Sequence, residues 1–179
     1  MPAKIADRFV WVVEMLEIAP SDRLLEIGCG SGVAVSLICD RLRSGRIVAI
    51  DRSPTMIRLA SKRNRAHLAS GKAAFQAAAL DELKFGKQRF TKAFAVNVGL
   101  FTQQPAQELK ILQRLLAPGG TVFLFNQPPT AAKAPVLAER MAEALRAGGF
   151  SIQRVTLKEM RPAPTACVVA RAPSNAACS

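Results

Sequence analysis

Three glycines at alternate positions, Gly28, Gly30 and Gly32, directly follow the short apolar stretch 24–27. In a turn between a strand and a helix, glycines let the backbone approach a ligand closely, and the N-terminus of the helix offers unpaired N–H groups. This spacing predicts a site for a nucleotide-like ligand, although a tight turn without a ligand would also explain the glycines. The dinucleotide fingerprint has its third glycine one position later, where Val33 stands, so the spacing disfavours NAD.

Two carboxylates accompany the glycines. Asp51 ends the apolar stretch 46–51, where doubly wound nucleotide-binding proteins place a carboxylate on the ribose hydroxyls, because its two acceptor oxygens match a vicinal diol. An aspartate that merely begins a helix is the alternative. Glu26 lies inside an apolar stretch, and a carboxylate buried there needs a cationic or hydrogen-bond-donating partner. We expect the ligand to be that partner.

The elements that must position these residues alternate between strands and helices. Apolar runs bounded by turn residues predict strands at 24–27, 46–51, 73–77, 93–98, 121–126, 151–157 and 165–171. Helical spacing of apolar residues predicts helices at 4–18, 33–42, 54–70, 133–147 and after Pro105. Because parallel strands need crossover connections, the alternation predicts a doubly wound α/β fold with a mostly parallel sheet and helices on both faces. The last two strands can pair as a hairpin.

Length and composition indicate a single globular domain. A chain of 179 residues fits one core, and we expect this domain to span 1–172, followed by a flexible tail at 173–179. No apolar run reaches the ~18 residues of a membrane span, and the first residues do not resemble a signal peptide. We therefore expect a cytoplasmic protein without a membrane partner. The four cysteines form no CxxC pair, which predicts free thiols and no metal site.

The net charge of +12 favours contact with an anionic partner such as nucleic acid, a phosphorylated substrate or a membrane surface. The basic residues are not interleaved with the aromatic side chains on which bases stack, and only 6% of the residues are aromatic. A solvated basic face is therefore the favoured interpretation, and nucleic-acid binding the less favoured one. Arg58, Lys62 and Arg65 recur at helical spacing, which predicts that they share one helix face.

Four ordered motifs resemble those of the class I S-adenosylmethionine-dependent methyltransferases. The stretch 25–32 (LEIGCGSG) is similar to the first motif of that family, and Ile50-Asp51 with Met56 downstream is similar to its ribose-binding motif. The stretch 94–98 (FAVNV) resembles the fourth-strand motif, and 115–120 (LLAPGG) resembles the turn before the fifth strand. The resemblance implies a single Rossmann-like domain with a seven-stranded sheet, in which a reversed last strand inserts between the fifth and the sixth. It also implies S-adenosyl-L-methionine as cofactor and a helix at 4–18 that caps the pocket.

The resemblance assigns roles to matching positions. Glu26 would reach the amino group of the methionine moiety, the three glycines with Cys29 would line that moiety, and Asp51 would hold the ribose. The positions expected to surround the adenine and the front of the pocket are Arg52, Met56, Ala79, Leu80 and Asn97. Relatives often carry an acidic residue where Ala79 stands, so the adenine amino group has no evident side-chain partner. Cys29 is interpreted as a packing residue and not as a nucleophile.

Methyl transfer from a sulfonium is an in-line displacement that requires alignment, so no dedicated catalytic residue is expected. Asn97 cannot titrate and could only orient an acceptor. The sole histidine, His67, is interpreted as a surface residue. A small-molecule acceptor is the favoured interpretation. An RNA methyltransferase that uses the basic surface and a non-catalytic cofactor-binding module are the alternatives, and the sequence does not indicate the oligomeric state.

Overall fold

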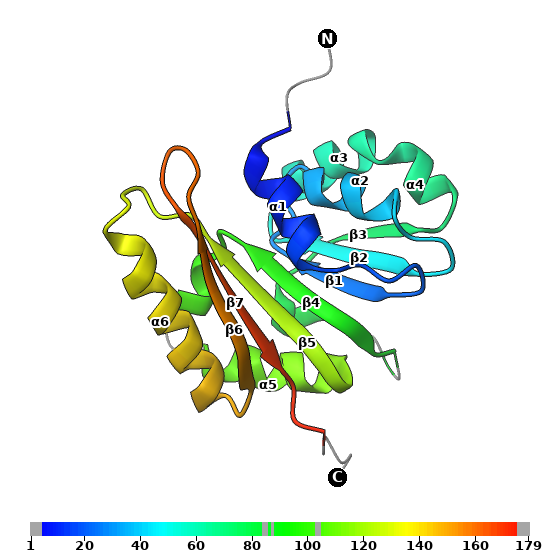
Figure 1. The fold of residues 1–179 in the computed structure, drawn as a ribbon. Coiled ribbons are helices and arrows are strands. Elements are labelled where there is room, and N and C mark those ends of the chain that lie inside the picture. The colour runs from blue at the N-terminus through cyan, green and yellow to red at the C-terminus, as the bar shows by residue number, and fades with distance from the viewer. Residues whose placement is uncertain (1–4, 84–85, 87, 103–104, 175–179) are drawn as a thin grey trace. The chain divides into compact units, whose positions relative to one another are not determined.

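The computed structural model describes residues 5–83, 86, 88–102 and 105–174 (Figure 1). The chain divides into two compact units, Met1–Ala79 and Leu80–Ser179, and each unit has its own strands and helices. The expectation of one domain over 1–172 stays a prediction. The expected tail overlaps residues 175–179, which lie outside the described part of the chain.

Three parallel strands form the sheet of the first unit. They are β1 (Arg23–Ile27), β2 (Arg46–Asp51) and β3 (Ala73–Ala77), in the order β3-β2-β1. Four consecutive residues of β1 and four of β2 are buried, as expected for strands that are covered on both faces. The register places Glu26 of β1 opposite Ala49 of β2, so the carboxylate residue lies within the apolar part of the sheet.

Four helices accompany this sheet. They are α1 (Asp7–Met15), α2 (Val33–Cys39), α3 (Pro54–Arg63) and α4 (Arg65–Ala69). Helices α2 and α3 pack on β2, and α3 and α4 pack on β3. Helix α1 is shorter than the predicted 4–18 and packs against α2 with Trp11, Val12 and Val13 buried. That α1 caps a cofactor pocket stays a prediction.

The helix predicted over 54–70 is interrupted at Asn64. Ser53 caps α3 as expected, accepting a hydrogen bond from the Met56 N–H, and Pro54 begins the helix. Asn64 leaves helical geometry and directs its side chain back to the carbonyl of Ala60. The prediction of one helix was wrong here because the buried side chain of Asn64 also bonds Gly32 and Ser36, which holds this residue outside helical geometry. The prediction that Arg65 shares one helix face with α3 was wrong for the same reason.

The second unit contains four strands in the order β4-β5-β7-β6. They are β4 (Phe90–Val96), β5 (Leu116–Asn126), β6 (Ser151–Lys158) and β7 (Thr165–Arg171). The pair β4 and β5 is parallel, whereas β7 runs antiparallel to both β5 and β6. The expected insertion of a reversed last strand, and its pairing with β6 as a hairpin, are therefore confirmed. The glycine turn at 118–120 lies within β5 as an irregularity in its pairing with β4.

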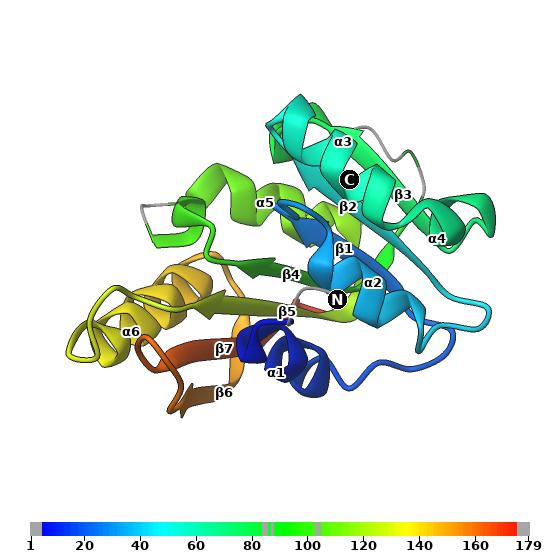
Figure 2. The same ribbon diagram turned by 90° about the horizontal axis from the view of Figure 1, so that it is seen from above.

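Two long helices complete the second unit, α5 (Ala106–Leu115) and α6 (Lys133–Ala147), with the short 3₁₀ segments η1 (Leu80–Glu82) and η2 (Gly99–Thr102). Helix α6 packs along β5, β6 and β7, and α5 packs on β5 and on α6 (Figure 2). Strand β7 is buried in six of its seven residues, whereas β6 lies at the edge of the sheet and is mostly exposed.

Candidate functional site

The glycine loop lies between β1 and α2 in the first unit. Gly28, Gly30 and Gly32 all have positive φ angles of 72°, 52° and 71°, respectively. The N–H groups of Gly28 and Cys29 donate to the carbonyl of Ile50 at 2.8 and 2.9 Å, so the loop is fixed to the end of β2. A Cβ at Gly30 would meet no atom within 4 Å beyond its chain neighbours, so open space adjoins the middle of the loop.

The Asp51 carboxylate is held by two backbone N–H groups. Oδ2 accepts from the Gly30 N–H at 2.9 Å, and Oδ1 accepts from the Ser53 N–H at 2.9 Å. Each oxygen has a second lone pair, so the carboxylate can still accept from a ligand. Asp51 is therefore not simply the residue that begins a helix, because Ser53 is the N-cap of α3 and Asp51 links this cap to the glycine loop.

Glu26 is 2% exposed, and its Oε2 is a buried atom without a hydrogen-bond partner. Burial raises the pKa of this carboxyl to about 8, and the nearby negative charge of Asp51 acts in the same direction. Glu26 is thus protonated at neutral pH in the free protein. Because a buried unpaired carboxyl is costly, the position is suited to a ligand that supplies a donor or a positive charge.

Cys29 is buried within the loop, and its Sγ lies 3.7 Å from the carbonyl oxygen of Gly30. Burial and the neighbouring carboxyl groups of Glu26 and Asp51 raise the pKa of the thiol. A thiol that stays protonated is a poor nucleophile, which supports a packing role for Cys29. Cys39 and Cys167 are also buried and free.

Asn64 supports the glycine loop, a role that sequence reasoning missed. Its side chain is fully buried, its Nδ2 donates to the carbonyl of Gly32 at 3.0 Å, and its Oδ1 accepts from the Ser36 hydroxyl at 2.8 Å. A Cβ at Gly32 would lie only 2.7 Å from the Asn64 Nδ2. Close packing on α3 therefore explains why glycine stands at position 32. No sequence spacing signals this contact, which joins residues 32 positions apart.

We expect Asn64→Ala to destabilise the protein by about 2–4 kcal/mol, because it removes the buried hydrogen bonds of the Asn64 side chain to the Gly32 carbonyl and from the Ser36 hydroxyl and leaves a void beside the loop. Urea unfolding measures this loss. Ser70→Ala is a suitable control, since the Ser70 hydroxyl bonds only a local carbonyl at an exposed position. Equal stabilities of the Asn64→Ala protein and the wild type would contradict the proposed support of the loop.

The remaining predicted site residues fall in both units. In the first unit, Arg52 is exposed at the end of β2, Met56 is half-buried on α3, and Ala79 is half-buried. Leu80, which is buried, and Asn97 belong to the second unit. The structure thus brings together Glu26, the glycines, Cys29 and Asp51. The roles of the other five stay predictions.

Asn97 follows β4 and adopts a left-handed backbone conformation with φ of 56°. Its backbone N–H donates to the Phe125 carbonyl, and its side-chain Oδ1 accepts from the Gln127 N–H at 2.7 Å. The Gln127 side chain in turn donates to the carbonyls of Arg161 and Ala163 in the loop between β6 and β7. The fixed Oδ1 leaves the amide Nδ2 of Asn97, an exposed residue, as a hydrogen-bond donor.

His67 lies on α4, where its side chain is half-buried and its Nε2 is 3.7 Å from an Asp40 carboxylate oxygen. Among the described residues, no group of three or more His, Cys, Asp or Glu side chains could hold a metal ion. None of the helices in the described ranges is long and apolar enough to cross a membrane.

Comparison with known proteins decides between the interpretations of this loop. The model of a methyltransferase domain family matches residues 24–120, which include most of β1, the glycine loop and Asp51. The chain belongs to this family. The predicted resemblance to S-adenosylmethionine-dependent methyltransferases is thereby confirmed, as are the enzyme class and the cofactor.

Two curated relatives of this methyltransferase illustrate the family. One is the uncharacterized methyltransferase YdaC of Bacillus subtilis strain 168, which is 24% identical over 92% of this chain and 91% of its own length. The other is the erythromycin 3''-O-methyltransferase of Saccharopolyspora erythraea, 23% identical over 69% of this chain and 40% of its own length.

Solved structures confirm the fold of this methyltransferase, a seven-stranded, mostly parallel sheet with a reversed last strand. The N-methyltransferase NodS from Bradyrhizobium japonicum WM9 superposes with a TM-score of 0.73 at 16% identity, covering 93% of this chain and 95% of NodS. The [4+2]-cyclase SpnF gives a TM-score of 0.74 at 20% identity, covering 93% of this chain and 81% of SpnF. Because one neighbour is named a cyclase, the fold alone does not define the reaction.

The site of this methyltransferase fits its cofactor. The buried and unpartnered Oε2 of Glu26 would be satisfied by an ammonium group, and the Asp51 oxygens have lone pairs for two hydroxyls. The open space beside Gly30 adjoins the residue whose N–H donates to Asp51.

Proposed function

We propose that this methyltransferase transfers the methyl group to a small-molecule acceptor. The observation that carries this proposal is the similarity to a curated relative whose name specifies erythromycin, a small molecule, as the acceptor. A structural neighbour named magnesium protoporphyrin IX methyltransferase, with a TM-score of 0.67 at 19% identity, adds support at the level of the fold.

Within the first unit, we assign Glu26, Asp51 and the glycine loop to cofactor binding. Glu26 would accept from the amino group and Asp51 from the ribose hydroxyls, while the Gly30 N–H keeps the Asp51 carboxylate oriented. Bound S-adenosylmethionine supplies an electrophilic methyl group on a sulfonium. The protein then needs to align the acceptor lone pair with the methyl carbon and exclude competing water. Arg52, Met56 and Ala79 of the same unit are proposed to contact the adenine.

Asn97 is proposed to orient the acceptor. Its Oδ1 is fixed by the Gln127 N–H, so its Nδ2 can donate to an oxygen or nitrogen of the acceptor. An amide does not titrate, so the acceptor supplies an uncharged lone pair or releases its proton to water. We therefore propose no catalytic base and no metal.

The acceptor class can be tested with methyl-labelled S-adenosylmethionine. The protein is incubated with a cell extract separated into a fraction of small metabolites and a fraction of total RNA. We expect label in small molecules other than the cofactor itself, and we expect Asp51→Ala to lower its yield when the cofactor is below saturation. Label only in RNA would contradict the proposed acceptor, and label in neither fraction would favour a non-catalytic binding protein.

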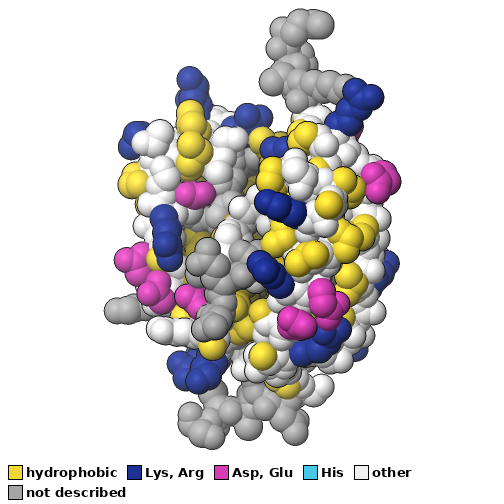
Figure 3. Space-filling view, turned by 90° about the vertical axis from the view of Figure 1, so that its left-hand side faces the viewer, with side chains coloured by type: hydrophobic (Ala, Val, Ile, Leu, Met, Phe, Trp, Pro, Cys, Tyr) yellow, Lys and Arg dark blue, Asp and Glu magenta, His cyan; other side chains and the backbone are white. Residues whose placement is uncertain are grey.

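The basic surface bears on the RNA alternative. Arg58 and Lys62 are exposed on α3, and the Arg58 guanidinium donates to the Thr55 hydroxyl. On the face shown in Figure 3, Lys and Arg side chains are scattered among acidic and hydrophobic ones instead of forming one patch. For this face, the distribution supports a solvated surface more than a binding site for phosphates.

We therefore expect RNA binding to be weak, indifferent to sequence and lost near physiological salt, because few phosphates are neutralised together. Fluorescence anisotropy with a labelled RNA over a range of salt concentrations measures this. Replacing Arg58, Lys62 and Arg65 with Gln should leave small-molecule methylation intact. Tight RNA binding that falls steeply with salt in the wild type, and is lost in the triple variant, would contradict the expectation.

A cytoplasmic location is part of the same proposal. It is supported by the buried free thiols of Cys29, Cys39 and Cys167, since reduced cysteines are typical of that compartment.

A further inference from the structure

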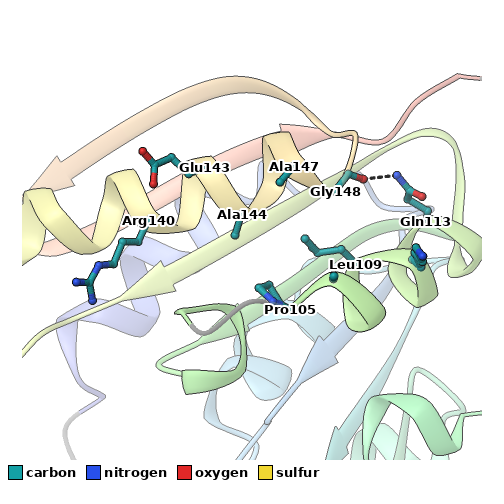
Figure 4. A pocket seen from close by; sticks show the side chains of 10 residues that line it. Pro105, Leu109, Gln113, Arg140, Glu143, Ala144, Ala147 and Gly148 are labelled. Atoms are coloured by element: carbon teal, nitrogen blue, oxygen red, sulfur yellow. Dashed lines mark hydrogen bonds between the residues drawn. The ribbon is translucent and has the colours of Figure 1, made fainter.

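A cavity of about 590 Å³ lies in the second unit between α5 and α6 (Figure 4). Its apolar wall comes from Pro105 and Leu109 at the α5 side and from Ala144 and Ala147 on α6. Concave sites for small molecules commonly have volumes between roughly 300 and 1,000 Å³ and mostly apolar walls. None of these residues belongs to the proposed cofactor or acceptor site.

The two helices are tied together at one end of this cavity. The Gln113 side chain donates to the carbonyl of Gly148, and a Cβ at Gly148 would lie 2.6 Å from a methyl carbon of Leu109. Figure 4 shows this contact at one end of the cavity and Arg140 toward the other. On α6 the lining includes Ala144 and Ala147, whose short side chains leave space between the two helices.

Charged side chains lie at the rim. Lys110 on α5 and Arg140 on α6 are exposed cations, and neither forms an ion pair with any residue that the structure describes. Glu143 is the one acidic lining residue among those described, and Figure 4 shows its side chain leaving α6 in a direction different from that of Arg140. The rim thus combines two unpaired positive charges with one negative charge, which favours a ligand with a single negative charge.

We propose that this α5–α6 cavity binds a small amphipathic anion. The apolar body of the ligand packs against Leu109, Ala144 and Ala147, and its acidic head remains at the rim, where Lys110 and Arg140 attract it. A concave apolar wall with charged groups only at its edge suits a molecule that has one apolar and one acidic end. The proposal is independent of the acceptor and of the cofactor site.

The probe for the test is 8-anilinonaphthalene-1-sulfonate, which joins an aromatic body to one sulfonate and fluoresces when it leaves water. We expect saturable binding of one probe molecule by the folded full chain. Filling the cavity with Ala144→Phe should weaken binding by about tenfold or more, a loss of about 1.4 kcal/mol. The matched control is Ala132→Phe at the exposed N-cap position of α6, which does not line the cavity. Ala147→Phe replaces Ala144→Phe if the latter does not fold.

The charge requirement is tested separately. Lys110→Gln with Arg140→Gln should weaken probe binding several-fold. The control, Arg114→Gln with Arg146→Gln, removes two positive charges from the same helices outside the cavity and should not weaken it.

A displacement experiment separates this cavity from the cofactor site. Saturating S-adenosylhomocysteine, the demethylated product of the cofactor, should not displace the probe. Absence of saturable binding, full binding by the cavity-filled variants, or displacement by S-adenosylhomocysteine would each overturn the proposal. Failure of the methyltransferase assay would not affect it.

Discussion

Glu26→Gln should make the free protein more stable at pH 8 than the wild type. The carboxyl is 2% exposed and its pKa is raised from 4.5 to about 8, chiefly by burial. The folded state therefore keeps this proton between pH 4.5 and 8, whereas the unfolded chain releases it. The stability linked to this proton is complete below pH 4.5 and is lost as the pH rises through 8. Glutamine has no proton to lose, so the variant gains up to about 3–5 kcal/mol at the upper end.

Urea unfolding at several pH values between 5 and 8.5 measures this effect. The wild type should lose stability toward alkaline pH relative to Glu26→Gln, with a difference of at most about 1.4 kcal/mol per pH unit. Glu159→Gln removes an exposed carboxylate and is the control. Parallel stability profiles of the wild type and Glu26→Gln would show that Glu26 ionises normally in the folded protein.

The same substitution should weaken binding of S-adenosylhomocysteine. An amino group beside Glu26 favours the ionised carboxylate, so binding below pH 8 releases a proton and wild-type affinity rises with pH. Glu26→Gln should bind about 10- to 100-fold more weakly, since it loses a charged hydrogen-bond partner, and its affinity should vary less with pH. Calorimetry in buffers of different ionisation enthalpy detects the released proton. Proton release that persists in Glu26→Gln would contradict this assignment.

Asp51→Ala is expected to affect both cofactor binding and folding. The carboxylate accepts from the N–H groups of Gly30 and Ser53, and both donors lose their partner in the variant. Cofactor affinity should fall by about 1.5–3 kcal/mol, and stability by about 1–3 kcal/mol, because the freed N–H groups are only partly exposed. The protein should nevertheless remain folded.

Ser53→Ala separates the two effects. It removes the N-cap of α3, which accepts from the Met56 N–H, and should cost about 1 kcal/mol of stability while leaving Asp51 in place. Its affinity for S-adenosylhomocysteine should stay close to that of the wild type. If folded Asp51→Ala binds as tightly as the wild type, Asp51 only organises the loop and does not hold the ribose.

Much of the fold could be predicted because its elements are bounded by strong local signals. The runs 46–51, 73–77 and 165–171 are strands with the predicted bounds, and 133–147 is the predicted helix. Each is an apolar run or a periodic stretch with glycine, proline or a charged residue next to at least one of its ends. The break at Asn64 could not be predicted, because it depends on hydrogen bonds to Gly32 and Ser36, which lie far away in the sequence.

The candidate cofactor site also has residues that the sequence could predict and contacts that it could not. Glu26 could be singled out because a carboxylate within an apolar strand conflicts with its surroundings, and its burial is confirmed. The bond from the Gly30 N–H to Asp51 depends on how β1 and β2 align in space, and local patterns do not contain that information. The α5–α6 cavity likewise arises from small side chains on two helices whose packing no sequence spacing reveals.

Calorimetry of the full chain with S-adenosylhomocysteine and with NAD tests most directly the claim that the loop at Gly28, Gly30 and Gly32 is a methyltransferase cofactor site. Val33, the first residue of α2, stands where the dinucleotide fingerprint has its third glycine, and this disfavours NAD. The open space beside Gly30 leaves room for S-adenosylhomocysteine. We predict one site that binds S-adenosylhomocysteine with a micromolar Kd and no detectable binding of NAD at the same concentrations. Binding of NAD as tight as that of S-adenosylhomocysteine, or tighter, would contradict the claim.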